Sequence, residues 1–151
     1  MPFFIFVFVA STFSLNETDG IDGLSSGVSL IALAVFIIIA FVQGRFELAA
    51  LLMVIGGALV PYLWYNMPTA SWFMGDTGSM MLGALFGVLA MYTNTALLLP
   101  LILCVPFMES TSVIIQVTSK KLRHKKIFKS TPIHHHFEAI GWSEAMVTMR
   151  F

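Results

Sequence analysis

The sequence has few charged residues and a single cysteine, and these shortages limit the class of protein. Only 11% of its 151 residues are charged, whereas 58% are hydrophobic. A soluble domain of this length needs a larger polar surface, so the composition predicts a membrane protein. Cys104 has no partner for an internal disulfide, and we expect it to be a small buried hydrophobic residue. No cleavable signal peptide is predicted, because Met1–Val9 contains no basic residue.

Four hydrophobic runs approach the ~20 residues that a membrane-spanning helix needs. They are Leu24–Val42, Leu48–Tyr65, Ser79–Tyr92 and Ala96–Val117. Met1–Leu15 is too short for a full span and predicts a partial N-terminal helix. Pro100 and Pro106 predict that the last run is bent or broken, and its polar second half favours a surface-lying or cavity-lining helix. The expected fold is therefore an all-α, polytopic membrane helix bundle with about four full spans.

The basic residues predict the orientation of these spans. Six of the eight lie between Lys120 and Lys129, directly after a hydrophobic run. This placement favours a cytoplasmic membrane loop over a nucleic-acid site. Counting back through the spans places residues 66–78 and 16–23 on the cytoplasmic side as well, and Gly44–Glu47 outside.

Three polar segments therefore fall on one side of the membrane. We name them the Asp loop (Asn16–Gly23), the GDTG segment (Gly75–Ser79) and the histidine segment (Pro132–Glu138). Acids and imidazoles beside lipid are costly, so such residues suggest a function. Their shared side is the main indication that they form one site.

Each segment also allows a purely structural interpretation. Asp19 and Asp22 could cap a helix, but the flanking glycines and Asn16 suit a loop that offers oxygen atoms to Mg²⁺ or sugar hydroxyls. Asp76, or a neighbouring hydroxyl, could cap a helix beginning near Ser79, or Asp76 could bind a metal beside a phosphate.

Phe73 and the three histidines also allow either a structural or a functional interpretation. Phe73 is either an interfacial aromatic residue or a surface on which a nucleobase stacks. The three consecutive histidines cannot all point one way; in an extended segment, His134 and His136 would share a face opposite His135. A zinc site is disfavoured because the only cysteine lies in a hydrophobic run. Imidazoles suit hydrogen bonds to ribose or phosphate, or proton transfer.

In this order and with these spans between them, the three segments resemble the polyprenyl-phosphate N-acetylhexosamine-1-phosphate transferase superfamily. Pro132–Glu138, followed by Gly141-Trp142-Ser143-Glu144 and Arg150-Phe151, is similar to the muramoyl-peptide branch, the phospho-N-acetylmuramoyl-pentapeptide transferases. The resemblance covers essentially the whole chain and corresponds to the C-terminal half of a family protein. We therefore expect residues 1–151 to be one incomplete membrane domain that lacks the N-terminal helices and the last span.

The resemblance implies a reaction and its site residues. The reaction is the Mg²⁺-dependent transfer of phospho-MurNAc-pentapeptide from UDP-MurNAc-pentapeptide to undecaprenyl phosphate, giving lipid I and UMP for peptidoglycan synthesis at the inner face of the bacterial plasma membrane. Asp76 and Asn16 match metal-binding positions, Asp76 and Asp19 are the implied catalytic residues, and Phe73 matches the aromatic residue that stacks on uracil. The remaining implied substrate-binding residues are Asn16, Asp19, Gly20, Asp22, Gln116, His134, His135 and His136.

The sequence departs from the family pattern at two points. Glu17 occupies a position that is usually apolar, and no Asp-Asp dipeptide is present, although the family carries one in an earlier loop. A transporter that uses Glu109, a non-catalytic membrane fragment and a related sugar-1-phosphate transferase therefore remain alternatives. A homodimer is left open, and no nucleic-acid partner is expected.

Overall fold

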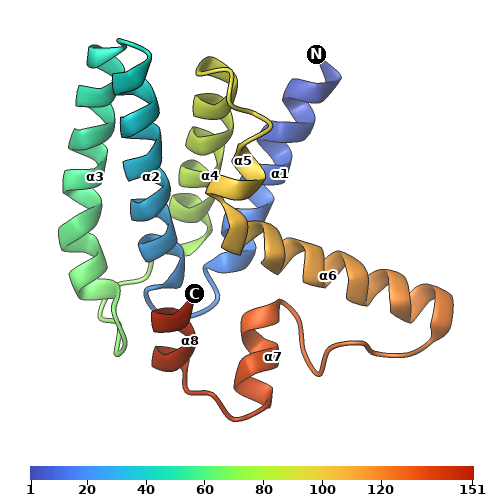
Figure 1. Ribbon diagram of the computed structural model, residues 1–151. Helices are drawn as coiled ribbons and strands as arrows, with labels where there is room; N and C mark the ends of the chain where they lie inside the picture. Colours follow the sequence, from blue (N-terminus) through green and yellow to red (C-terminus); the bar gives the residue numbers. More distant parts are fainter.

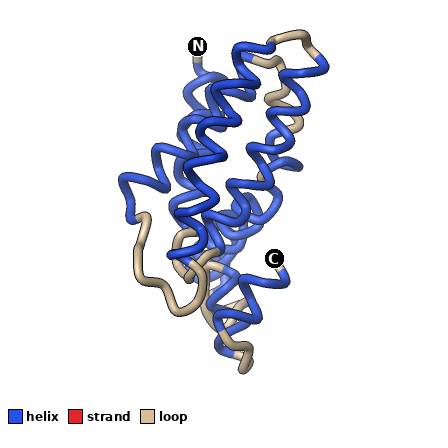
Figure 2. The backbone as a smooth tube through the Cα atoms, turned by 90° about the vertical axis from the view of Figure 1, so that its left-hand side faces the viewer, coloured by secondary structure: helices blue, strands red, loops and turns tan.

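The computed structural model describes residues 1–151 and contains only α-helices joined by loops and turns (Figures 1 and 2). The helices are α1 (Pro2–Thr18), α2 (Leu24–Val42), α3 (Phe46–Asn66), α4 (Gly75–Tyr92), α5 (Leu99–Ile102), α6 (Cys104–Arg123), α7 (Ile133–Ala139) and α8 (Glu144–Arg150). The predicted all-α class is confirmed.

Helices α2 and α3 form an antiparallel pair (Figure 1). The apolar run of α2 ends at a tight turn, where Gly44 adopts a φ of 70°, a backbone conformation that glycine enters without steric cost. By length and composition, α2 and α3 are the two helices long and apolar enough to cross a membrane. Val54 and Trp64 of α3 are 71% and 78% exposed, as expected of side chains that face lipid. Four full spans are not confirmed.

Helix α4 packs along α1 through glycine. A Cβ atom added to Gly83 would lie 2.7 Å from the Ser11 carbonyl oxygen, so the two backbones can approach this closely only without a side chain there. On the other side of α4, the Phe86 ring stacks on Phe36 of α2, with ring centroids 6.0 Å apart. The main apolar core therefore includes side chains from all four helices α1, α2, α3 and α4.

The run Ala96–Val117 does not form one span. It divides at Leu103 into α5 and α6, so the break expected from Pro100 and Pro106 is confirmed. Helix α6 then extends to one side of the bundle (Figure 1), and the Ser110 hydroxyl donates to the Ser14 hydroxyl of α1 at 3.0 Å. Cys104, which directly follows the break, is exposed; the expectation that it is buried is wrong.

Helices α7 and α8 pack at one end of the bundle, beside the loops that follow α1 and α3 (Figure 1). A second apolar cluster holds them there; its buried members are Ile21, Leu24, Val28, Val105 and Val147. The Gly44 turn lies at the opposite end (Figure 1). All three polar segments thus reach the same end of the molecule.

Candidate functional site at the loop end of the bundle

Asn16 connects the Asp loop to the GDTG segment. It lies in the last turn of α1, and its Nδ2 donates to Asp76 Oδ1 at 3.0 Å and to Ser79 Oγ at 3.1 Å. Helix α4 begins at Gly75, so Asp76 lies in its first turn, earlier than the start expected near Ser79. A carboxylate is favourable there because the free N–H groups make a helix N-terminus positive.

Asp19 is the half-buried carboxylate of the Asp loop. Its Oδ1 accepts a 2.7 Å hydrogen bond from the Ser25 hydroxyl at the start of α2. Burial raises the pKa of Asp19, and the negative charge of Asp76 adds to the rise, while hydrogen bonds from Ser25 and the Gly75 backbone oppose it. Asp19 and Asp76 therefore carry neighbouring carboxylates, and neither is paired with a lysine or an arginine.

Asp22 and Phe73 both line an open cleft of about 150 Å³. Asp22 Oδ2 accepts from the Ala70 N–H at 2.9 Å, which ties the Asp loop to the loop after α3. The Phe73 side chain is 74% exposed and free to receive a planar group. The cleft is lined by Asp19, Gly20, Ile21, Asp22, Asn66, Phe73, Met74 and Gly75. Four predicted substrate-binding residues thus meet in one depression.

The histidine segment packs against the Asp loop. It is helical, so the extended arrangement with His134 and His136 on one face is wrong. His134 is completely buried, and a Cβ atom added to Gly20 would lie 2.5 Å from its Nε2. His135 pairs with Glu138, while His136 Nδ1 accepts from the Lys129 N–H at 3.1 Å. As expected, the three imidazoles point to different partners.

Comparison with known proteins identifies the family. The family model described as "Glycosyl transferase family 4" matches residues 1–94. This chain belongs to glycosyl transferase family 4.

Relatives named phospho-N-acetylmuramoyl-pentapeptide-transferase extend the similarity over the whole chain. The protein of Clostridium novyi (strain NT) is 42% identical over 151 residues, which is 100% of this chain and 46% of the relative. That of Rubrobacter xylanophilus is 44% identical over 147 residues, 97% of this chain and 44% of the relative. That of Clostridium kluyveri is 44% identical over 151 residues, 100% of this chain and 48% of the relative. The chain spans about half the length of these relatives.

Gln116 lies apart from the cleft of this family member. It is buried on α6, where its Oε1 accepts from the Ile127 and Phe128 N–H groups at 3.0 and 3.1 Å. Its Nε2 donates to the Phe128 carbonyl at 2.8 Å. The side chain thus holds the basic loop after α6, and its contact with uracil stays a prediction.

Two residues that shape the cleft were not predicted. Asn66, buried at the end of α3, donates to the Trp72 carbonyl at 2.9 Å and accepts from Ser26 at 2.7 Å, which fixes the loop carrying Phe73. Ser25 holds the Asp19 side chain in place through the hydrogen bond that its hydroxyl donates to Asp19 Oδ1. The only sequence signal was a polar residue at the end of an apolar run, and that signal is also typical of ordinary helix ends.

The donor set fits the magnesium ion that the family resemblance implies. Asp19 and Asp76 supply carboxylates, and Asn16 uses its amide nitrogen on Asp76, which leaves its carbonyl oxygen for another partner. Mg²⁺ typically takes one or two carboxylates and completes its shell with water and phosphate. No group of three or more His, Cys, Asp or Glu side chains could hold a metal by itself. The arrangement therefore suits an ion that arrives with a phosphate ligand.

Proposed function

We propose that this chain carries the nucleotide-binding side of a phospho-N-acetylmuramoyl-pentapeptide transferase site. The reaction transfers phospho-MurNAc-pentapeptide from UDP-MurNAc-pentapeptide to undecaprenyl phosphate and yields lipid I and UMP. One observation supports this most: the Asp loop lines the cleft and contacts both other polar segments, although the three are separated by up to about 120 residues of sequence. Family membership favours an enzyme over a transporter, and the names of the relatives suggest the substrates.

The cleft suits the uridine part of the donor. The exposed Phe73 ring offers a stacking surface, and stacking on an aromatic ring holds any base through its π-face. Asp19 and Gly20 line the cleft, and the Asp19 carboxylate and the Gly20 backbone would contact the ribose. His135 and His136 are partly exposed on α7, and in this proposal they would donate to ribose or phosphate oxygens.

The carboxylates suit the diphosphate. Asp76, Asn16 and Asp19 would hold Mg²⁺, which when bound would supply positive charge to the phosphate oxygens. Asn16 orients the Asp76 carboxylate through its 3.0 Å hydrogen bond, and Ser25 orients Asp19. Phosphoryl transfer depends mostly on positioning and charge stabilisation, so side chains held at fixed orientations are the protein's main contribution.

The proposal places the cleft at the cytoplasmic face of the bacterial plasma membrane, with the bilayer around α2, α3 and neighbouring helices. Two apolar helices and the basic loop after α6 support this placement. The product would enter peptidoglycan synthesis, and through it cell-wall growth, cell shape and division.

A radiolabelled lipid I assay tests the proposal. Residues 1–151 contain no Asp-Asp pair and match about half of each relative, so we expect no product from this chain alone in detergent with Mg²⁺. Co-expression with the N-terminal half of the Clostridium novyi relative should restore synthesis, and Asp76→Asn should remove most of it again. Robust product from the chain alone, or none after complementation by a correctly inserted half, would contradict the proposal.

A further inference from the structure

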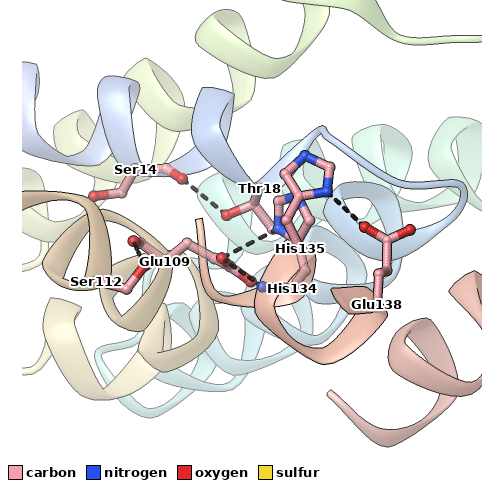
Figure 3. A network of polar contacts seen from close by, with 7 residues as sticks. All are labelled: Ser14, Thr18, Glu109, Ser112, His134, His135 and Glu138. Carbon is pink, nitrogen blue, oxygen red and sulfur yellow. Dashed lines mark hydrogen bonds and ion pairs between the residues drawn. The ribbon is translucent and has the colours of Figure 1, made fainter. Parts of the chain in front are cut away.

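Glu109 of α6 and His134 of α7 form a completely buried pair (Figure 3). Both side chains have essentially no solvent exposure. Glu109 lines no part of the cleft and has no role in the function proposed above. A buried acid beside the site therefore needs its own explanation, because burying a charged group is costly.

Glu109 holds the start of α7. Its Oε2 accepts from the His134 backbone N–H at 3.2 Å and lies 3.1 Å from His134 Nδ1. Pro132, the residue before α7, supplies no side-chain cap. The Glu109 carboxylate of α6 thus provides the acceptor that the first turn of α7 lacks. A negative charge is also favourable at this position, because a helix N-terminus is positive.

The same imidazole contacts the Asp loop on its other side. His134 Nε2 lies so close to Gly20 that a side chain on this glycine would collide with it. Gly20 and the adjacent Asp19 line the cleft. An unbroken series of contacts therefore runs from Glu109 through His134 to Gly20, which lines the cleft, and the same helix α7 carries His135 and His136.

Stability alone does not explain this pair. Glu109 Oε1 and both ring nitrogens of His134 make no hydrogen bond; Nδ1 lies within ion-pair distance of Oε2, but the angles are not those of a hydrogen bond. Buried polar atoms left without partners cost free energy, and apolar side chains of similar volume commonly stabilise a fold more than such a pair.

We propose that Glu109 is a positioning residue that fixes α7 against the Asp loop and thereby sets the affinity of the cleft for a uridine nucleotide. The inference rests on the proposed function, since it assigns a residue to the binding of that substrate. Glu109 acts through His134 and does not touch the nucleotide itself.

Hydrogen–deuterium exchange of residues 1–151 in detergent tests the first half of the inference. Glu109→Ala should raise the exchange rate of the α7 amides at least tenfold while α2 and α3 keep their protection. Glu109→Gln keeps an oxygen acceptor for the His134 N–H, so its increase should be smaller. Glu47→Gln, which removes an exposed carboxylate at the far end of the bundle, is the matched control. Unchanged α7 protection in Glu109→Ala, or an equal loss throughout α2 and α3, would overturn the inference.

Equilibrium binding of UMP with Mg²⁺ to the same samples tests the second half. Affinity should fall about tenfold in Glu109→Ala, recover partly in Glu109→Gln and stay unchanged in Glu47→Gln. Equal affinity in all variants despite a loosened α7 would overturn the positioning role. Absence of UMP binding to the wild-type chain would instead count against the proposed function, while exchange at α7 still decides whether Glu109 holds the helix. If Glu109→Ala does not fold, Glu109→Asp, which shortens the reach by one methylene, replaces it with the same expectation.

Discussion

Asn16 Nδ2 donates a 3.0 Å hydrogen bond to Asp76 Oδ1, across 60 residues of sequence. The bond joins the last turn of α1 to the first turn of α4 and holds one oxygen of the Asp76 carboxylate in place. It depends on the close packing of α1 on α4 that Gly83 permits. An apolar helix contact thus positions the polar groups of the proposed site.

Replacement of Asp76 by asparagine should remove most activity without unfolding the protein. In the complemented transferase, Asp76→Asn should lower kcat by at least about a hundredfold, because it removes a charge from a site whose catalysis is mostly electrostatic. Asp76 is exposed, so the variant should insert and unfold like the wild type. The measurement is lipid I synthesis at limiting Mg²⁺; near-normal turnover would refute the metal-binding role.

Ionisation of Asp19 should destabilise the folded state at neutral pH. Its pKa is raised above the ordinary value of 3.8, mainly by burial, so the folded chain holds this proton more tightly than the unfolded chain. This loss of stability is therefore complete above the raised pKa of the folded chain. It disappears as the pH falls through that pKa toward the ordinary value. In EDTA, Asp19→Asn should raise the Tm at pH 7 and change it little at pH 4.

Thermal unfolding in detergent, followed by circular dichroism, measures this difference. Glu47→Gln is the control, because it removes an exposed carboxylate at the opposite end of the bundle. A Tm that falls by the same amount at both pH values would show that hydrogen bonding at Asp19, and not its charge, determines its contribution.

A methyl group at Gly20 should displace α7. The added Cβ would meet the buried His134 ring, which cannot move into solvent. Overpacking of this kind costs about 1–3 kcal/mol, so Gly20→Ala should lower stability and weaken binding in the cleft. Gly27→Ala is the matched control, because nothing lies within 4 Å of its new Cβ atom. Equal effects of the two substitutions on α7 exchange would contradict the packing of His134 on Gly20.

The sequence predicted some parts of this molecule well. Residues 24–42 form α2 as expected, because a long apolar run that is broken only near its start and ends at a glycine turn has few alternatives. The meeting of the three polar segments followed from threading the chain through a membrane. The helical conformation of the histidine segment did not, because α7 is capped by Glu109, 25 residues earlier. Asn66 was likewise missed, since its role depends on a loop that folds back onto it.

The two ends of the bundle should lie on opposite sides of the membrane. Glu47 and Lys125 are both exposed, at the Gly44 end and in the basic loop, respectively. Cysteine labelling from outside intact cells, in a Cys104→Ser background because Cys104 is exposed, should modify Glu47→Cys and leave Lys125→Cys unmodified. The basic loop is the reason for this orientation. The reverse pattern would overturn the threading of the chain.

Binding of UDP-MurNAc-pentapeptide to purified residues 1–151 tests the central claim most directly, because it asks whether the three polar segments form one nucleotide site. We expect saturable, Mg²⁺-dependent binding that UMP displaces. Phe73→Ala should weaken it about 5- to 150-fold, the equivalent of ~1–3 kcal/mol of base stacking. Absence of saturable binding to the folded chain, or unchanged affinity in Phe73→Ala, would contradict the account.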